Sequence, residues 1–336
     1  MKNNRRDFLR MAGLTGLGMA GGLSSLANDS LYTPGTPLVM NAAENMNALK
    51  AVAAAGETSL IGPYGTWAAS LISKDLPSLS FRRKEFSKVD SWRSQARQRL
   101  TDRLAVPAIG GMPEVKLKKQ YTYDGLHVEE LTWQLPYGRA TEGILLKPAG
   151  AAKPLPGVLA FHDHGANKYF GTRKITRTSD DQHPVMKEHQ ELYYGNRAWA
   201  NELAKRGYVV LVSDAFPFAS RRVMFGDVPE HLRNGHTDDD PENPQNIKIY
   251  NDWAAEHEHI MAKSLFSAGT TWPGVFFAED RKALDILCAR KDVDTARVGC
   301  GGLSGGGMRT VFMGGMDPRI QCAVCVGFMT TWKEFI

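Results

Sequence analysis

The segment that decides the fold is RVGCGGLSGGGMRTVFMGG, residues 297–315. It begins with apolar residues at strand length, passes through a run of glycines around Ser304, and continues with residues typical of a helix. Gly302, Ser304 and Gly306 fit the pattern G-x-S-x-G, with Leu303 directly before the serine. Between a strand and a helix, this pattern places the serine on a sharp turn with its hydroxyl exposed. The sequence therefore predicts that Ser304 is a catalytic nucleophile.

The glycines beside the serine have a steric reason. Side chains at Gly302 and Gly306 would collide with the neighbouring helix and strand, and the serine has to hold a strained backbone at the turn. The helix that follows begins with backbone N–H groups and a partial positive charge, which stabilise an oxyanion forming beside the hydroxyl. Gly305 is the predicted first oxyanion donor. The alternative is a glycine-rich structural turn in which the serine is incidental.

A second oxyanion donor is expected on the loop after an earlier strand. The run VLAFHDHG, residues 158–165, begins with four apolar residues and ends in polar ones, as a buried parallel strand and its loop do. Because ligands bind outside the carboxyl ends of parallel strands, this loop and the Ser304 turn should meet there. His164, Gly165 and Ala166 are the predicted donors.

The same loop contains a candidate metal-binding pair. His162 and His164 alternate, so both side chains can face one side of the strand end and hold a metal ion. No further ligand has a suitable spacing: His257 and His259 point to different faces of a predicted helix, and His236 lies in an aspartate-rich stretch typical of a solvated loop. The sequence thus predicts no metal and no cofactor, and a metal-dependent hydrolase stays as an alternative.

Strands and helices alternate through the second half of the chain. Three stretches of strand length, separated by turn signals, favour an antiparallel start: residues 115–123, 127–135 and 141–149. Further predicted elements are a strand at 158–161, a helix at about 190–206, a strand at 208–215, a helical region to about 290, a strand at 296–302, a helix to 314 and a strand at 320–328. This order predicts a doubly wound, mostly parallel α/β sheet.

The predicted domain of this fold occupies residues 115–336. Within it, residues 217–252 are polar and rich in Pro, Asn and Asp, which indicates an insertion or lid. Residues 28–114 are predicted as a loose lead and a helical preface, in which Trp92 and Leu100 share one helix face.

The first 27 residues have the pattern of an export signal, with a charged start, a weakly apolar run and small residues before Ala27. The pair Arg5-Arg6 resembles the twin-arginine signal family, which implies export by the twin-arginine machinery to the periplasm or the outside. The apolar run is too short and glycine-rich for a stable membrane span. A G-x-G-x-x-G spacing from Gly16 lacks the strand and helix that a dinucleotide site needs.

The formal charge of +5 does not indicate a nucleic-acid partner. The first 27 residues contain four basic residues against one acidic residue, so the remainder carries only +2. No basic stripe with interleaved aromatic residues is found in the sequence. The expected partner is a small molecule.

All four cysteines lie in the last 49 residues, which does not fit a disulfide framework. Cys322 and Cys325 lie in an apolar, strand-like run, which favours burial in the core. The alternative is a disulfide from Cys300 to one of them, as an exported protein permits.

Five stretches resemble the α/β-hydrolase superfamily, and more narrowly its acetyl xylan esterase and dienelactone hydrolase-like branch of exported bacterial esterases. They are VLAFHDHGANK, GYVVLVSDAFPF, FFAEDRKALDIL, RKDVDTARVGCGGLSGGG and MDPRIQCAVCVGFM. They follow the family's order over about residues 120–335. The resemblance implies a serine esterase that acts on small esters such as acetylated carbohydrates. Dienelactone hydrolases proper use a cysteine nucleophile, so Ser304 places the chain nearer the esterases.

The resemblance also implies the chain order nucleophile, acid, histidine. All nine histidines precede Ser304, and Ile336 follows it by 32 residues. We therefore expect the acid and the base after residue 336, in a longer enzyme of which this sequence is a truncated and nearly inactive piece; Glu334 is an alternative acid. Loss of the base in a serine hydrolase costs about 10⁶-fold in turnover. The other expectation is a non-catalytic binding protein that uses a cleft under the 217–252 insertion.

Overall fold

The protein is described here from a computed structural model, in which residues 62, 64–71, 75–239 and 242–329 are described. The predicted export signal, the glycine spacing from Gly16 and the alternative acid Glu334 lie outside the described residues. The described residues belong to two compact units, one of which contains the described residues up to Ala96, while the other is Arg97–Met329.

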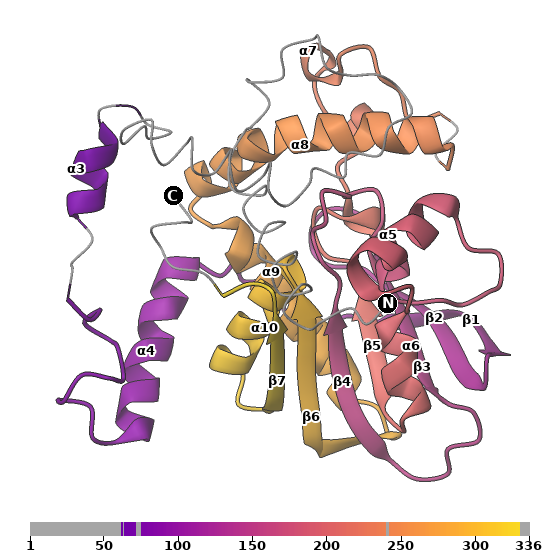
Figure 1. Ribbon diagram of the computed structural model, residues 1–336, viewed down its shortest axis with the longest axis horizontal. Coiled ribbons are helices and arrows are strands. Elements are labelled where there is room, and N and C mark those ends of the chain that lie inside the picture. Colours follow the sequence, from indigo (N-terminus) through magenta and orange to yellow (C-terminus); the bar gives the residue numbers. More distant parts are fainter. Residues whose placement is uncertain (1–61, 63, 72–74, 240–241, 330–336) are drawn as a thin grey trace, which may run out of the picture. The chain divides into compact units, whose positions relative to one another are not determined.

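The larger unit is built on a seven-stranded sheet with the order β1-β2-β3-β5-β4-β6-β7. The strands are β1 (Val115–Tyr123), β2 (Leu126–Trp133), β3 (Thr141–Pro148), β4 (Leu155–Phe161), β5 (Val209–Ser213), β6 (Val293–Leu303) and β7 (Ile320–Val326). The pairs β1–β2, β2–β3 and β3–β5 are antiparallel, whereas β5–β4, β4–β6 and β6–β7 are parallel. The predicted antiparallel start and the mostly parallel α/β sheet are both confirmed (Figure 1).

Helices connect the strands. They are α3 (Tyr64–Ser70), α4 (Val89–Leu104), α5 (Pro184–Tyr194), α6 (Trp199–Lys205), α7 (Glu230–Arg233), α8 (Pro244–Ser267), α9 (Trp272–Cys288) and α10 (Gly305–Met316), with short 3₁₀ turns η1 (Thr172–Lys174), η2 (Ala219–Arg221) and η3 (Phe225–Asp227). The prediction of a single helix at about 190–206 is wrong, because two helices, α5 and α6, occupy this region. Gly195 and Asn196 take left-handed φ values of 59°, which ends α5 and separates it from α6.

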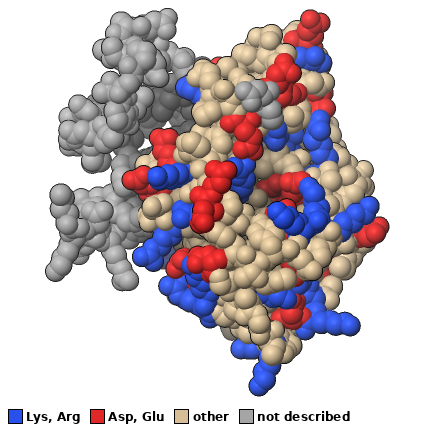
Figure 2. Space-filling model, turned by 90° about the vertical axis from the view of Figure 1, so that its right-hand side faces the viewer, with Lys and Arg blue, Asp and Glu red and all other residues tan. Residues whose placement is uncertain are grey.

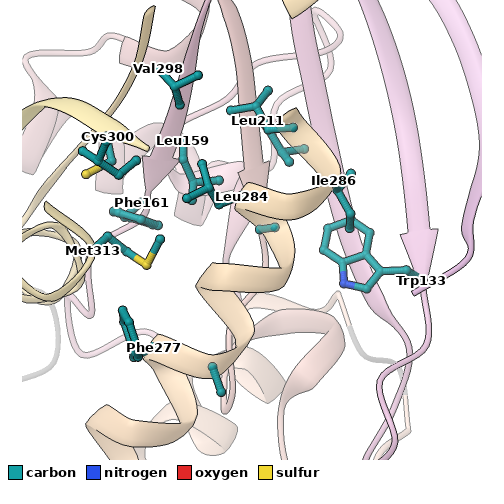
Figure 3. Packing of buried hydrophobic residues seen from close by; sticks show 14 of the residues in the cluster. Trp133, Leu159, Phe161, Leu211, Phe277, Leu284, Ile286, Val298, Cys300 and Met313 are labelled. Carbon is teal, nitrogen blue, oxygen red and sulfur yellow. The ribbon is translucent and has the colours of Figure 1, made fainter. Parts of the chain in front are cut away.

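The two faces of the sheet carry separate cores. On one face, Leu159 and Phe161 of β4 pack with residues of α9 and α10, among them Leu284 and Met313 (Figure 3). On the other face, Ala160 of β4 and its strand neighbours pack against α6. Because successive strand residues point to opposite faces, β4 is buried on both sides, which fixes the position of its carboxyl end.

The region predicted as an insertion contains a core of its own. The segment 217–252 includes η2, η3, α7 and the start of α8. Helix α8 begins here because Asn243 caps its N-terminus and Pro244 occupies its first position. Phe225, Tyr250 and Trp253 form an aromatic cluster with residues that follow β4. Aromatic residues therefore hold the segment in place, although its polar composition does not indicate them. Figure 1 shows α8 crossing the unit at one end of the sheet.

Strand β7 lies at the edge of the sheet, and this corrects the prediction for its cysteines. Cys322 is exposed and Cys325 is half-buried, because residues 321–324 are uncovered in the described part of the chain. Cys300 on β6 is buried as part of the core. All four cysteines are free, so the disulfide alternative is not formed.

Charges of both signs are interspersed on the face of the larger unit shown in Figure 2. Lys118 of β1 and Glu142 of β3 form one exposed pair, at 2.8 Å. Within the described residues, we find no helix with the length and apolar character that crossing a membrane requires.

The smaller unit is described only in part. In it, the indole N–H of Trp92 donates to the carbonyl of Leu79 at 2.8 Å, and the Trp92 ring lies 5.1 Å from the ring of Phe81. Of the predicted helical stretch, α4 forms a helix that contains Trp92 and Leu100, whereas residues 75–88 form turns.

Candidate active site

Ser304 lies on the turn between β6 and α10. Its backbone has φ +55° and ψ −118°, a conformation that costs a non-glycine residue on the order of 1–3 kcal/mol. Backbone hydrogen bonds hold the turn: the Ser304 N–H donates to Val326 O at 2.9 Å, and the Met308 N–H donates to Ser304 O at 3.0 Å. The serine thus lies at the carboxyl end of a parallel strand, directly before the positive end of a helix.

The backbone around the turn leaves no room for side chains at the flanking glycines. A Cβ atom on Gly302 would lie 2.6 Å from the carbonyl carbon of Gly306, and one on Gly306 would lie 2.5 Å from the carbonyl oxygen of Phe161. The turn is therefore packed backbone against backbone, between its own helix and the end of β4.

The loop after β4 lies against the turn. A Cβ atom on Gly305 would lie 3.1 Å from the backbone nitrogen of His164. The Ala166 N–H is already used inside the loop, where it donates to Nδ1 of His164 at 3.2 Å. Of the three donors predicted on this loop, the structure therefore brings the His164 backbone N–H beside the turn. The N–H of Ala166 already donates a hydrogen bond within the loop.

Gly165 has a different role in this arrangement. Its φ is +51°, and a Cβ atom on it would lie 2.2 Å from a carboxylate oxygen of Asp163 and 2.6 Å from the ring of His189. Only a glycine fits this close approach.

The side chain of His164 is fully engaged. Nε2 lies 3.1 Å from Oε1 of Glu258 on α8, and Oε2 of Glu258 accepts from Nζ of Lys168 at 2.8 Å. The carboxylate needs a donor, so Nε2 carries the proton and Nδ1 accepts from Ala166. Burial lowers the pKa of His164 and keeps the ring neutral. With its one lone pair committed to Ala166, this histidine is not available to take the proton of Ser304.

His162 is buried at the end of β4. Its Nδ1 donates to the backbone carbonyl of Asp163 at 3.0 Å. Burial, helped by the nearby charges of Arg309 and Lys174, lowers its pKa well below the usual value, so it stays neutral. In the described part of the chain, we find no group of three His, Cys, Asp or Glu residues arranged to hold a metal ion.

The other histidines that raised a metal alternative have aromatic neighbours. The ring of His257 stacks on Trp253 at 4.7 Å, and the ring of His236 lies 5.3 Å from Phe225.

A buried ion pair anchors the helix that follows the serine. Arg309 on α10 donates to Asp280 on α9 through Nε at 2.9 Å and Nη2 at 2.6 Å, and both side chains are almost fully buried. The guanidinium also lies 4.5 Å from the ring centre of Phe161. The helix N-terminus beside Ser304 is thereby fixed to both α9 and β4.

Aromatic side chains line the region beside the loop. The ring of His164 lies 5.4 Å from Phe218 and 6.2 Å from Trp272, and Trp272 stacks on Phe276 at 5.5 Å. Met308 of α10 packs with this group. We call Phe218, Trp272, Phe276 and Met308 the aromatic wall.

The sequence did not reveal Glu258, Lys168 or Lys174 as parts of this region. Glu258 reaches the loop from a distant position in the chain, Lys174 from η1, and Lys168 lies at the end of the loop itself; no motif marks them. Their buried contacts with the loop, described below for Lys174, are visible only in the folded chain.

Comparisons with known proteins agree with this architecture. No protein-family model matches the chain. Over 199 residues it is 26% identical to "Putative hydrolase YtaP" of Bacillus subtilis, which covers 59% of this chain and 51% of that protein. The structure matches that of "a putative acetyl xylan esterase" from Bacteroides fragilis with a TM-score of 0.54 and 17% identity, over 79% of this chain and 61% of that one. The chain has the α/β-hydrolase fold.

The likeness to the Bacteroides structure shows the fold alone. The chain also spans only about half the length of the curated relative that it matches.

Proposed function

We propose that this α/β-hydrolase chain is part of a serine esterase in which Ser304 is the nucleophile. The observation that carries the proposal is the backbone of Ser304, with φ +55° at the strand-to-helix turn and the β4 loop directly against it. A serine held in a strained conformation at such a turn is typical of a nucleophile elbow.

The two proposed oxyanion donors are the backbone N–H groups of Gly305 and His164. Gly305 is the first residue of α10, so its N–H has no acceptor within the helix. His164 N lies beside Gly305, as the 3.1 Å approach of a Cβ placed there indicates. Two N–H groups directed at one oxygen stabilise the negative charge of a tetrahedral intermediate.

The proposed reaction proceeds in two steps. The oxygen of Ser304 attacks the carbonyl carbon of the ester, while a histidine takes the hydroxyl proton. The ester C–O bond then breaks, the alcohol leaves with that proton, and an acyl-serine remains. Water, deprotonated by the same histidine, attacks the acyl carbon and releases the acid and Ser304. We propose that the histidine and its acid partner follow residue 336 in the natural chain, as the resemblance implies.

An acetylated carbohydrate is the proposed substrate. The resemblance of the sequence to the acetyl xylan esterase branch supports it, and so does the name of the Bacteroides protein with the same fold. Trp272 of the aromatic wall is only partly buried, and its apolar ring lies 6.2 Å from the ring of His164; apolar rings are a common lining of small-molecule sites. We further propose that the protein is exported by the twin-arginine route to the periplasm or the outside.

The test uses the complete product of the gene. A fluorophosphonate probe should label the wild-type protein at Ser304, and acetate should be released from acetylated xylan. Ser304→Ala should abolish both, because the alanine has no nucleophile. Ser264→Ala, which changes an exposed serine on α8, is the matched control and should leave both unchanged.

Two other outcomes separate the alternatives. A folded protein that takes no label and releases no acetate would support the non-catalytic binding protein. Activity that survives Ser304→Ala but is lost on treatment with a chelator would support the metal-dependent hydrolase.

A further inference from the structure

Lys174 is the most deeply buried lysine in the described part of the chain, with 0% exposure, and no step proposed above uses it. It lies on η1, and its Nζ donates to two consecutive backbone carbonyls of the β4 loop: Asp163 O and His164 O, each at 2.9 Å. The ring of Phe218 lies 4.7 Å from the same nitrogen. A buried ammonium group is unfavourable unless it is paired and hydrogen-bonded. Burial accordingly lowers the pKa of Lys174 to about 8.

One of the two carbonyls that Lys174 binds, Asp163 O, belongs to the peptide that carries the His164 N–H, beside Gly305. In a trans peptide the C=O and the following N–H point in opposite directions. The peptide of Asp163 O carries the His164 N–H, and a second donor, Nδ1 of His162, also binds this oxygen at 3.0 Å. With the oxygen held on the Lys174 side, the N–H is directed to the opposite side, where Gly305 lies.

Lys174 is itself held in place from several sides. The carboxylate of Asp163 lies 3.9 Å from Nζ and is bound in turn by His189 at 3.1 Å and by the hydroxyl of Tyr194. At the start of η1, the Thr172 N–H donates to Asp214 at 2.8 Å. The ammonium group is thus held in one position, and its hydrogen bonds orient the two loop carbonyls.

We propose that Lys174 is the positioning residue of the oxyanion site, which directs the His164 N–H at the oxyanion by binding the carbonyls of Asp163 and His164. This inference rests on the proposed function. It assigns Lys174 an effect on the transition state through the loop, without contact with the substrate.

The test measures turnover of p-nitrophenyl acetate by the complete product of the gene. Lys174→Met should lower kcat about 10- to 100-fold, the range expected when an oxyanion donor is misplaced. KM should change by less than about threefold, since the donor acts on the transition state rather than on the bound ester. Lys174→Arg, which keeps the charge and the N–H donors, should restore part of the lost kcat.

A transition-state analogue gives a second readout that a general loss of stability would not change. Phenylboronic acid forms a tetrahedral anion on a catalytic serine, and its inhibition constant should rise in Lys174→Met by about the factor by which kcat/KM falls.

Arg221→Met is the matched control. Arg221 is also a buried cation that binds two backbone carbonyls, those of Tyr137 and Arg139, together with the carboxylate of Glu279. None of these partners belongs to the β4 loop. The variant should lose thermal stability, while kcat per folded molecule stays within about twofold of the wild type.

The outcomes distinguish the inference from the function on which it rests. If Ser304→Ala retains full turnover, the proposed function is wrong. If Ser304→Ala is inactive but folded Lys174→Met keeps the wild-type kcat, the inference alone is overturned. Should Lys174→Met not fold, Lys174→Ala, which is shorter and likewise has no N–H donor, replaces it, and an unchanged kcat in that variant overturns the inference equally.

Discussion

The turn at Ser304 and the loop at residues 162–168 lie against each other, yet different interactions fix their shapes. The turn is held by backbone packing, with three glycines in places where a Cβ atom would meet neighbouring backbone. The loop is held by buried charges: Lys174 binds its carbonyls, and Glu258 joins His164 to Lys168. The nucleophile side of the site should therefore be sensitive to added volume, whereas the loop side should be sensitive to lost charge.

The largest effect is expected outside both the turn and the loop, at the buried ion pair that anchors α10 to α9. Asp280→Ala leaves the guanidinium of Arg309 buried without its carboxylate partner, which costs about 3–5 kcal/mol. The free energy of unfolding, measured by urea denaturation, should fall by that amount.

A double variant serves as the control for this pair. Asp280→Leu with Arg309→Met removes both charges, and it should recover most of the stability that Asp280→Ala loses. A double variant as unstable as the single one would show that packing, rather than the unpaired charge, causes the loss.

The next effect tests added volume at the turn. Gly306→Ala places a Cβ atom 2.5 Å from the carbonyl oxygen of Phe161, so the backbone has to shift, at a cost of about 1–3 kcal/mol. Turnover should fall as well, because the shift moves Gly305. Gly315→Ala is the control on the same helix: nothing lies within 4 Å of its added Cβ, so stability should stay the same or rise. Equal losses in the two variants would contradict a steric origin.

The contrast between turn and loop also explains what the sequence revealed. The G-x-S-x-G pattern is a local steric requirement, so Ser304, Gly302 and Gly306 could be placed on a strand-to-helix turn from their neighbours in the chain. The positions of the strands along the chain followed from hydrophobic runs in the same way. The roles of these residues in catalysis stay predictions until the variants are measured.

The loop could not be worked out in this way. Its shape depends on Glu258, about ninety residues further along the chain, and on a lysine in an irregular segment. The break at Gly195 was missed although Gly195 and Asn196 are local stop signals for a helix. The aromatic core of the segment 217–252 was missed because it depends on tertiary packing. Buried charges carry no sequence signal that separates them from solvated ones, which is why Lys174 and Glu258 were found only in the structure.

On the loop side, we expect Glu258→Gln to cost about 2 kcal/mol, since it weakens the charge-assisted bonds from His164 and Lys168. Burial alone would raise the pKa of Glu258, but these two donors outweigh it and hold the pKa below its usual 4.5. A carboxylate with a lowered pKa in the folded state stabilises the protein above the unfolded pKa, and this contribution is lost as the pH falls below it.

The stability difference between the wild type and Glu258→Gln should therefore be constant near neutral pH and shrink below about pH 4.5. Urea denaturation at a series of pH values measures it. Glu256→Gln, at an exposed position on the same helix, is the control and should change the free energy of unfolding by less than about 0.5 kcal/mol. A difference for Glu258→Gln that stays constant through acid pH would show that its charge does not hold the loop.

The smallest effect is expected for a charge pair outside the site. Lys118 and Glu142 lie 2.8 Å apart, and about half of each side chain is exposed. Water and salt screen such a pair, so Lys118→Met should change the free energy of unfolding by less than about 0.5 kcal/mol, and even less at high salt. The charge type and distance match those of the Lys168–Glu258 pair, also at 2.8 Å but with the lysine side chain only 4% exposed. Since the two pairs differ chiefly in burial, a loss for Lys118→Met as large as that for Glu258→Gln would mean that burial is not what gives the loop its sensitivity to charge.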